Sequence, residues 1–318
     1  MLMMVMVTMM VAMMCVYVRV CVCAYAAPYP WLKSSSFALV RASSHPSRHE
    51  VPQGPERRQL RGRQACYSGP EQSVWELTMG KEIDIGAASS TMELAQKAGV
   101  GPGMKGVELN CNNGGGMRCL VCLVGVDSMT CVDMTKKVVE TGRQRTQEEG
   151  LSDKITFINA NSLQNGLPDA SADFVYSKDA WCYIPDKQQI IDQAARIVKP
   201  GGTIMFTDWI EGEGLSEEEA QRYLSLMTFP AIPTVQEYAR MLEKAGCTVK
   251  VAEDSGRFSP AMECYCYMLK YQAVYDAKKL LGWNDQAYDK LISDFEFMAK
   301  LAKEGKIIQG MFVATKGA

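Results

Sequence analysis

One pattern constrains the fold of this chain more than any other. A short apolar segment ends in a carboxylate near Glu108, a glycine-rich turn follows at residues 114–116, and a second short apolar segment ends in Asp133. Glycines let a backbone approach a ligand closely, and an acid at the end of the second strand can accept hydrogen bonds from ribose hydroxyls. The pattern therefore predicts an α/β unit that binds a nucleoside-bearing cofactor, although the G-x-G-x-x-G signature of dinucleotide-binding proteins is absent.

Strand-like and helix-like segments alternate along residues 66–318, called the body below. We predict strands over residues 106–110, 129–133, 154–160, 172–177, 203–208, 247–253 and 306–316. Predicted helices between them include 91–100, 117–123, 135–149, 186–198 and 235–245. This alternation predicts a doubly wound, mostly parallel sheet with helices on both faces. Two longer helical stretches, 261–281 and 285–303, precede the last strand, and we expect a helical lid over about residues 258–304.

The first 65 residues differ in composition from the body. Residues 1–18 are uncharged and rich in Met and Val, and Ala24-Tyr25-Ala26 fits a signal-peptide cleavage site. Residues 27–65 combine six serines and seven Lys/Arg with two acids, as transit peptides do. We predict a two-part plastid leader over residues 1–65 and a folded domain over residues 66–318. The alternatives are a membrane anchor, or a misassigned start codon with a cytoplasmic protein.

Charge, histidine and cysteine content exclude several classes of function. Residues 66–318 carry 26 Lys/Arg (34 − 8) and 34 Asp/Glu (36 − 2). Their net charge of −8 would repel the negatively charged backbone of a nucleic acid. Both histidines, His45 and His49, lie in the predicted leader, so the body has no Ser-His-Asp site and no histidine metal ligand. The twelve cysteines lack the spacing of a zinc ribbon. We therefore expect buried free thiols and no metal.

A second set of motifs carries a resemblance to a known family. The set comprises residues 173–181 (DFVYSKDAW), 185–187 (PDK), 195–202 (ARIVKPGG) and 206–208 (FTD). Over about residues 72–316 the chain resembles class I S-adenosylmethionine (SAM)-dependent methyltransferases, and most nearly the glycine/sarcosine/dimethylglycine group that makes the osmolyte betaine. The resemblance implies a Rossmann-like, seven-stranded sheet with a C-terminal helical insertion before the last strand. It also implies SAM as the cofactor.

The resemblance assigns cofactor contacts residue by residue. Glu108 is expected near the amine of the cofactor's amino-acid end, and Asp133 on the ribose hydroxyls. Asn161 and Ser162 are expected at the adenine ring. The remaining cofactor candidates are Asn110, Gly114, Met134 and Ser177. The sequence departs from the family where Asn110 and Asn112 replace glycines, but asparagine tolerates a left-handed backbone, so the loop can still form.

Candidate acceptor-site residues follow the fourth and fifth predicted strands. Asp179, Trp181 and Tyr183 are the predicted catalytic residues, and Lys178, Trp209, Arg257 and Tyr265 the predicted substrate contacts. Aromatic side chains at this edge suit a cationic amine or a sulfonium, although each could equally be core packing. Arg257 could form a fork with a substrate carboxylate, or it could be an ordinary surface arginine.

These residues predict a methyltransferase for a small metabolite. The first expectation is methyl transfer from SAM to a nitrogen of a carboxylated amine like sarcosine or dimethylglycine. The alternatives are S-methylation of a methylthio carboxylic acid on the route to dimethylsulfoniopropionate, and a non-catalytic relative that has lost SAM. Phosphoethanolamine is disfavoured because no basic cluster marks a phosphate site. We expect a small-molecule partner, no nucleic acid and no stable membrane span in the mature protein, and we allow for a homodimer.

Overall fold

The computed structural model describes residues 70–317. The predicted leader over residues 1–65 lies outside the described residues, so its plastid destination stays a prediction. Within the described part of the chain, no helix is long and apolar enough to cross a membrane.

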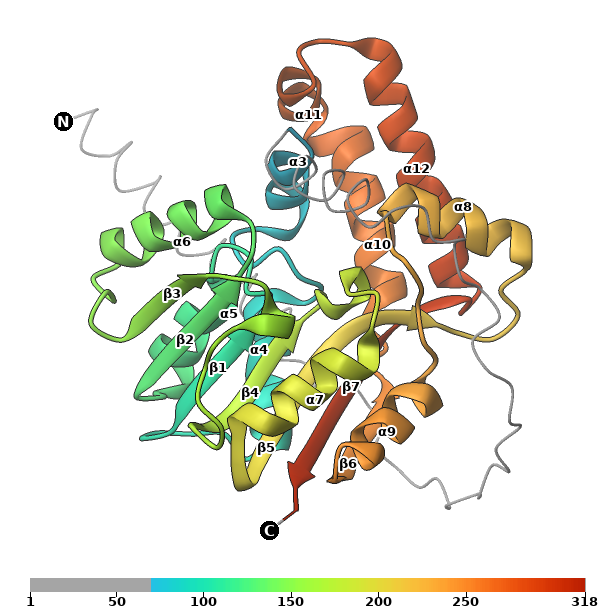
Figure 1. Ribbon diagram of the computed structural model, residues 1–318. Helices are drawn as coiled ribbons and strands as arrows, with labels where there is room; N and C mark the ends of the chain where they lie inside the picture. Colours follow the sequence, from blue (N-terminus) through green and yellow to red (C-terminus); the bar gives the residue numbers. More distant parts are fainter. Residues whose placement is uncertain (1–69, 318) are drawn as a thin grey trace, which may run out of the picture. The chain divides into compact units, whose positions relative to one another are not determined.

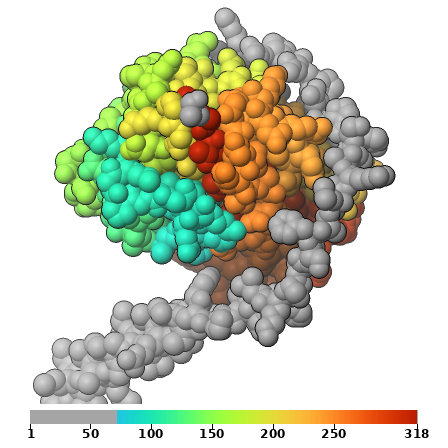
Figure 2. Space-filling view, turned by 90° about the horizontal axis from the view of Figure 1, so that it is seen from below, coloured from blue at the N-terminus to red at the C-terminus, as the bar shows by residue number. Residues whose placement is uncertain are grey.

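A seven-stranded sheet with the order β3-β2-β1-β4-β5-β7-β6 forms the centre of the molecule (Figure 1). Five strands run parallel, and β7 is antiparallel to both of its neighbours. In Figure 2, seen from below, the red end of β7 lies between the yellow and orange segments of β5 and β6. The predicted doubly wound, mostly parallel sheet is therefore confirmed. The strands are β1 (Lys105–Leu109), β2 (Ser128–Asp133), β3 (Ile155–Asn159), β4 (Ala172–Lys178), β5 (Val198–Glu211), β6 (Cys247–Asp254) and β7 (Ile307–Lys316).

Helices cover both faces of this sheet because side chains alternate along the strands. On β4, Phe174 and Tyr176 enter one apolar cluster and Val175 enters the other. The first cluster is covered by α4 (Ala87–Ala98), α5 (Gly115–Cys119) with the π-helical turn Leu120–Val124, and α6 (Lys136–Glu148). The second is covered by α7 (Lys187–Ile197) and α9 (Val235–Lys244).

A further group of helices lies over the carboxyl ends of the parallel strands (Figure 1). It comprises α3 (Pro70–Met79), α8 (Glu217–Met227), α10 (Phe258–Tyr267), α11 (Val274–Leu280) and α12 (Asp285–Lys303). These helices share one apolar cluster. The predicted helical insertion before the last strand is present, but the stretch expected as one helix is interrupted by a π-helical turn at Met268–Gln272. Helix α3 was not predicted from the sequence.

Candidate active site

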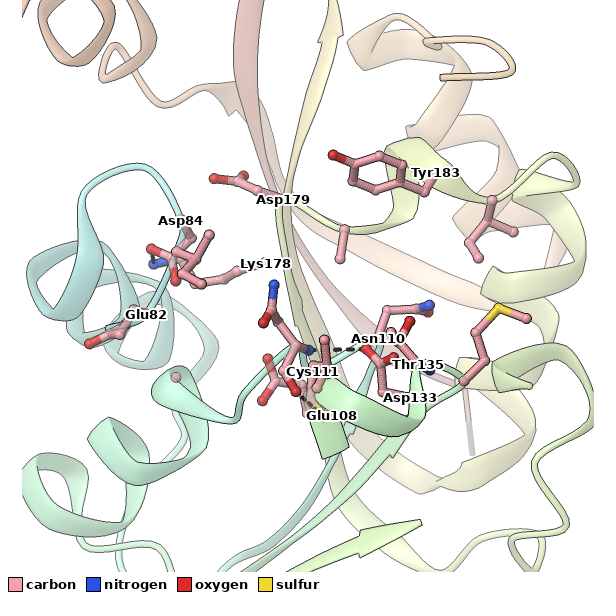
Figure 3. A pocket seen from close by; sticks show the side chains of 17 residues that line it. Glu82, Asp84, Glu108, Asn110, Cys111, Asp133, Thr135, Lys178, Asp179 and Tyr183 are labelled. Carbon is pink, nitrogen blue, oxygen red and sulfur yellow. Dashed lines mark hydrogen bonds and ion pairs between the residues drawn. The ribbon is translucent and has the colours of Figure 1, made fainter. Parts of the chain in front are cut away.

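A cavity of about 840 Å³, including its open mouth, lies where β1, β2 and β4 end (Figure 3). In open α/β sheets, ligands bind at this edge. Its walls come from the connection between α3 and α4, the end of β1 with the loop and helix start after it, the end of β2 with the start of α6, and the end of β4 with the turn after it. The lining residues are Glu82, Ile83, Asp84, Glu108, Asn110, Cys111, Asn112, Gly116, Asp133, Met134, Thr135, Val138, Lys178, Asp179, Ala180, Tyr183 and Ile184.

The loop after β1 adopts the tight turn that the glycine-rich sequence predicts. Asn110 and Asn112 have φ angles of 66° and 48°, so both asparagines take the left-handed conformation expected of them. Gly116 lines the cavity, and a Cβ there would lie 2.6 Å from the Tyr176 hydroxyl. The missing side chain therefore lets the start of α5 pack closely on Tyr176 of β4. Gly114, also left-handed, lies outside the lining and packs near Phe157.

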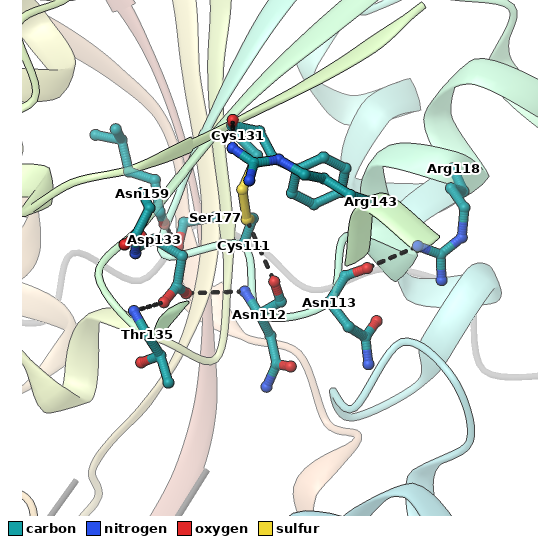
Figure 4. Close-up of a disulfide and its surroundings, with 12 residues drawn as sticks. Cys111, Asn112, Asn113, Arg118, Cys131, Asp133, Thr135, Arg143, Asn159 and Ser177 are labelled. Carbon is teal, nitrogen blue, oxygen red and sulfur yellow. Dashed lines mark hydrogen bonds between the residues drawn. A yellow bond between two sulfur atoms is a disulfide. The ribbon is translucent and has the colours of Figure 1, made fainter. Parts of the chain in front are cut away.

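Asp133 holds the loop after β1, residues 110–114 and hereafter the cofactor loop, against the start of α6 (Figure 4). Its Oδ1 accepts from the Thr135 N–H at 2.8 Å, and its Oδ2 accepts from the Asn112 N–H at 3.1 Å. Thr135 precedes α6 at its N-cap position, but its hydroxyl makes no cap hydrogen bond. Burial raises the pKa of Asp133 to about 6 despite these two donors. Each carboxylate oxygen has a second lone pair, so the side chain can still accept from ribose hydroxyls.

Glu108 is a buried carboxyl with an unused oxygen. It is 4% exposed, lines the cavity, and its Oε2 has no hydrogen-bond partner. Burial, followed by the nearby charges of Asp84 and Glu82, raises its pKa well above the usual range. The Oδ1 of Asn110 beside it is likewise buried without a partner. Unsatisfied buried acceptors are uncommon in native structures, and these two would suit a ligand's ammonium group.

Lys178 forms a buried ion pair with Asp84. Its Nζ also donates to the Ala87 carbonyl and to the Thr91 hydroxyl, both at 3.1 Å. An ammonium has three donors, so this set uses all of them. Burial raises the pKa of Asp84 to about 7, although the charge of Lys178 acts to lower it. Lys178, predicted as a substrate contact, thus ties the connection before α4 to the end of β4.

Asp179 lies between this cavity and a second, smaller one. Its backbone is left-handed, with φ 49°. Its carboxylate accepts from the Ile85 N–H at 2.8 Å, the Thr207 hydroxyl at 2.9 Å, and Gln309 Nε2 at 2.8 Å and 2.9 Å. These contacts fix the orientation of the predicted catalytic acid. Gln309, fully buried on β7, was not predicted because it is far away in sequence.

The second cavity has aromatic walls and a volume of about 310 Å³. It is lined by Trp75, Met79, Ile83, Asp179, Tyr183, Trp209, Met227 and Phe229. Ile83, Asp179 and Tyr183 line both cavities, so the two spaces adjoin. In Figure 3, Asp179 and Tyr183 lie in the upper part of the view, with Glu108 and Asp133 below them. Trp209 was predicted as a substrate contact and lines this second space, whereas Trp75 comes from the unpredicted helix α3.

Several predicted site residues lie outside both cavities. Trp181 is fully buried and packs on Phe206 at 4.3 Å, because the 3₁₀ turn Trp181–Tyr183 directs it into the core. Tyr265 belongs to the cluster under the helical insertion. Ser177 donates to the Leu109 carbonyl, and Asn161 accepts from the Leu163 N–H. Ser162 is buried in the segment after β3. Arg257 forms an ion pair with Glu93.

Sequence reasoning missed the acidic segment that closes the cavity. Glu82 and Asp84 lie between Gly80 and Gly86, both of which are left-handed. Two acids in a short connection bounded by glycines indicate a turn beside a ligand, so this segment could have been predicted from the sequence. Their position over β1 and β4 depends on the buried Lys178 contact, which is a tertiary feature.

A disulfide between the loop after β1 and β2 corrects the prediction of free thiols at two cysteines. Cys111 and Cys131 form a disulfide between the loop and β2 (Figure 4). Six other cysteines in the described part of the chain are free, as expected, but only Cys119, Cys182 and Cys247 among them are buried, whereas Cys122 and Cys264 are exposed. Burial raises the pKa of Cys119 to about 12 and that of Cys182 well above its usual value, so neither thiol is reactive. Residues 70–317 contain no cluster of side chains that could hold a metal ion.

Residues 107–206 match a family model described as a methyltransferase domain. Among curated relatives, phosphoethanolamine N-methyltransferase 1 of Zea mays is 24% identical over 238 residues, covering 74% of this chain and 46% of that protein. A sterol 24-C-methyltransferase of Gibberella zeae is 30% identical over 131 residues, 41% of this chain and 34% of that protein. The chain thus spans about half the length of the plant relatives that it matches.

Solved structures show the same fold. A protein named as a sarcosine dimethylglycine methyltransferase of Galdieria sulphuraria aligns with a TM-score of 0.64 at 21% identity, covering 72% of this chain and 85% of that one. Phosphoethanolamine N-methyltransferase 2 of Haemonchus contortus, in complex with phosphomonomethylethanolamine and S-adenosylhomocysteine (SAH), aligns with a TM-score of 0.72 at 19% identity. That alignment covers 82% of this chain and 59% of the other.

Proposed function

Since this chain carries a class I SAM-dependent methyltransferase domain, we propose that it methylates a nitrogen atom of a small amine of the sarcosine/dimethylglycine kind. One observation carries the proposal. The cofactor cavity and the aromatic-walled cavity adjoin at Asp179 and Tyr183. An acceptor nitrogen in the second cavity would therefore lie beside the methyl group of a cofactor in the first.

The chain's own residues fit the cofactor. Glu108 Oε2 and Asn110 Oδ1 are buried acceptors without partners, suited to the ammonium of the amino-acid end. Asp133 has lone pairs left for the ribose hydroxyls. When bound, SAM supplies a methyl group already activated on a sulfonium, so the protein's part is alignment and exclusion of water. The absence of histidine from residues 66–318 is compatible with a reaction in which the cofactor supplies the activated methyl group and the protein aligns the reactants.

Charge favours an amine over a phosphorylated acceptor. Lys178 is the one cation among the described residues that line either cavity, and its three donors are already used. Asp179 and the aromatic rings would instead stabilise the positive charge that develops on the attacking nitrogen. A phosphate group in the second cavity would meet the carboxylate of Asp179, and the described residues that line this cavity include no cation to balance it.

S-methylation of a methylthio carboxylic acid is the second candidate. The aromatic walls favour it for the same reason, since the sulfonium product also carries a positive charge without N–H donors. Either product would be a small zwitterion of the osmolyte type.

A substrate panel tests the proposal. We would incubate the protein with methyl-labelled SAM and glycine, sarcosine, dimethylglycine, a methylthio carboxylic acid or phosphoethanolamine, and then detect products by mass spectrometry. Label in the methylated amines is the expected result. Label only in the thioether product selects the second candidate, and label only in phosphoethanolamine contradicts both. If SAH does not bind in calorimetry, the chain is a non-catalytic relative.

Cofactor affinity should rise with pH between about 5 and 7.5. The folded-state pKa of Asp133, about 6, lies above its ordinary value, so the stability that this group gives the free protein is present at low pH and is lost as pH rises through 6. Ribose hydroxyls favour the ionised carboxylate, so binding releases a proton below pH 6. We expect SAH to bind about tenfold more weakly at pH 5 than at pH 7.5, and Glu108 adds to the same trend.

Calorimetry across this pH range gives the measurement, and Asp133→Asn provides the control. The variant should lose part of the slope, because its side chain cannot ionise. Affinity that falls as pH rises would contradict the assignment of both acids to the cofactor.

A further inference from the structure

We infer that the disulfide between Cys111 and Cys131 is a redox-sensitive modification site that controls the affinity of this chain for its cofactor. In the oxidised form, the disulfide holds the cofactor loop in the conformation that binds the cofactor. Reduction by a dithiol opens the disulfide, and the loop then binds the cofactor more weakly. Only the cofactor cavity is involved, so the control does not depend on which acceptor is methylated.

The disulfide joins the two segments that are expected to hold opposite ends of the cofactor (Figure 4). Cys111 follows Asn110, whose buried Oδ1 has no hydrogen-bond partner and suits the ammonium of the amino-acid end. Cys131 lies on β2, two residues before Asp133, the expected contact of the ribose hydroxyls. The Cα atoms of the two cysteines are 5.8 Å apart, an ordinary separation for a disulfide. The bond therefore limits how far the two cofactor contacts can move relative to each other.

Reduction should displace the loop rather than the strand. Cys131 is paired on both sides, with Glu108 of β1 and Phe157 of β3, and its side chain is fully buried in the apolar cluster on that face of the sheet. Two thiol groups in contact need more room than two bonded sulfur atoms, and a close-packed core cannot supply it. Cys111 lines the cofactor cavity, so the loop can yield in that direction.

The hydrogen bonds that such a displacement would break belong to the cofactor site. The Asn112 N–H donates to Asp133 Oδ2 at 3.1 Å, and the Asn110 N–H donates to the Val132 carbonyl at 2.8 Å. These two bonds fix the positions of Asn110 and Asp133 before the cofactor arrives. Without them, binding must order the loop as well as the ligand, and the cost of that ordering lowers the affinity.

The redox step needs only a dithiol, and the cofactor cavity is its route of entry. Cys131 is fully buried, whereas Cys111 lines the cavity, so a thiolate of the reductant attacks the Cys111 sulfur. Cys131 leaves as a thiolate and takes up a proton. The second thiol of the reductant then closes the reductant's own disulfide and releases Cys111 as a thiol. Two electrons and two protons pass from the dithiol to the cysteine pair, and a bound cofactor would block the attack.

Cofactor affinity and the redox potential of the pair must change by linked amounts. If the oxidised form binds SAH about tenfold more tightly than the reduced form, SAH must stabilise the disulfide by the same factor. For a two-electron couple, a factor of ten corresponds to about 30 mV. We therefore expect about tenfold tighter binding of SAH to the oxidised protein, and a midpoint potential that SAH lowers by about 30 mV.

Two measurements on the full chain test both quantities. Calorimetry with SAH compares the affinity of the protein in its disulfide form with that of the protein reduced by dithiothreitol. Equilibration in mixtures of reduced and oxidised dithiothreitol, with and without SAH, gives the midpoint potential. Thiol alkylation followed by peptide mass spectrometry reports the state of Cys111 and Cys131 in each sample.

Two variants show whether this disulfide is responsible. Cys131→Ala removes the disulfide at a residue outside the cavity lining, and its affinity for SAH should be lower than that of the oxidised wild type and equal with and without dithiothreitol. Cys122→Ala removes an exposed free cysteine outside both cavities and should keep the wild-type response to dithiothreitol. Thermal unfolding confirms that each variant is folded.

A purely structural disulfide would give a different result. It would act mainly by restricting the unfolded chain, so reduction would lower the Tm and leave the SAH affinity of the folded protein unchanged. Equal or tighter binding of SAH to the reduced wild type, a potential that SAH does not change, or a redox response that persists in folded Cys131→Ala overturns the inference, even when methyl transfer occurs. If SAH binds to neither form, the inference and the proposed function both fail.

Discussion

Lys178→Met is expected to lower the free energy of unfolding by about 3–5 kcal/mol, because it leaves the Asp84 carboxylate buried without its partner. The two side chains are 2% and 4% exposed, so solvent cannot replace the lost contact. The substitution also removes the donors to Ala87 and Thr91, which hold the connection before α4 on the end of β4. Urea unfolding, followed by circular dichroism, measures the change.

The free energy of unfolding that Lys178→Met loses should grow as pH rises. The folded-state pKa of Asp84 is already raised to about 7 by burial, and without Lys178 it would rise further. A carboxyl with a raised pKa stabilises the fold at low pH, and this contribution disappears as pH rises through its folded pKa. We therefore expect Lys178→Met to be more damaging at pH 8 than at pH 6.

Two control variants show whether the buried pair is responsible. The double variant Lys178→Met/Asp84→Asn should recover part of the stability, because no buried charge remains. Lys270→Met removes the exposed ion pair with Glu296 and should leave unfolding unchanged. A pH-independent loss in Lys178→Met, or no recovery in the double variant, would contradict a role for the unpaired charge.

Asp133→Ala is expected to weaken SAH binding by about 1.5–3 kcal/mol, or roughly 10- to 150-fold, because it removes an acceptor for two ribose hydroxyls. It also removes the acceptor for the Asn112 and Thr135 N–H groups, so the cofactor loop loses two contacts that shape it. Calorimetry with SAH measures the affinity.

Asp133→Asn and Asp153→Asn are the controls. Asp133→Asn keeps one oxygen for the loop but lacks the charge, so its loss should be smaller than that of Asp133→Ala. Asp153 is an exposed acid in the turn before β3, away from both cavities, and its substitution should change nothing. Wild-type SAH affinity in Asp133→Ala would show that the end of β2 does not contact the cofactor.

Local patterns in the sequence were sufficient to predict the sheet and the cofactor edge. Strand periodicity and glycine-marked ends located all seven strands, and the acids Glu108 and Asp133 lie at the cavity as expected. The substitution of asparagine for glycine at residues 110 and 112 also did what the backbone preference of asparagine predicts. These features depend on residues a few positions apart, so short-range physical chemistry determines them.

Only the tertiary structure decided which side chains form the acceptor side of the site. Trp75 and Trp209 are 134 residues apart (209 − 75), yet their rings lie 6.0 Å from each other. Trp181 and Tyr183 are two residues apart, yet one is core and the other lines both cavities, because a single 3₁₀ turn separates them. Cations that were candidates from their position alone are already paired: Lys178 with Asp84, and Arg257 with Glu93. The sequence by itself thus determined, through local periodicity, the sheet and the edge of the sheet where the first cavity lies. The acceptor cavity depends on long-range packing and burial, which no short window of sequence contains.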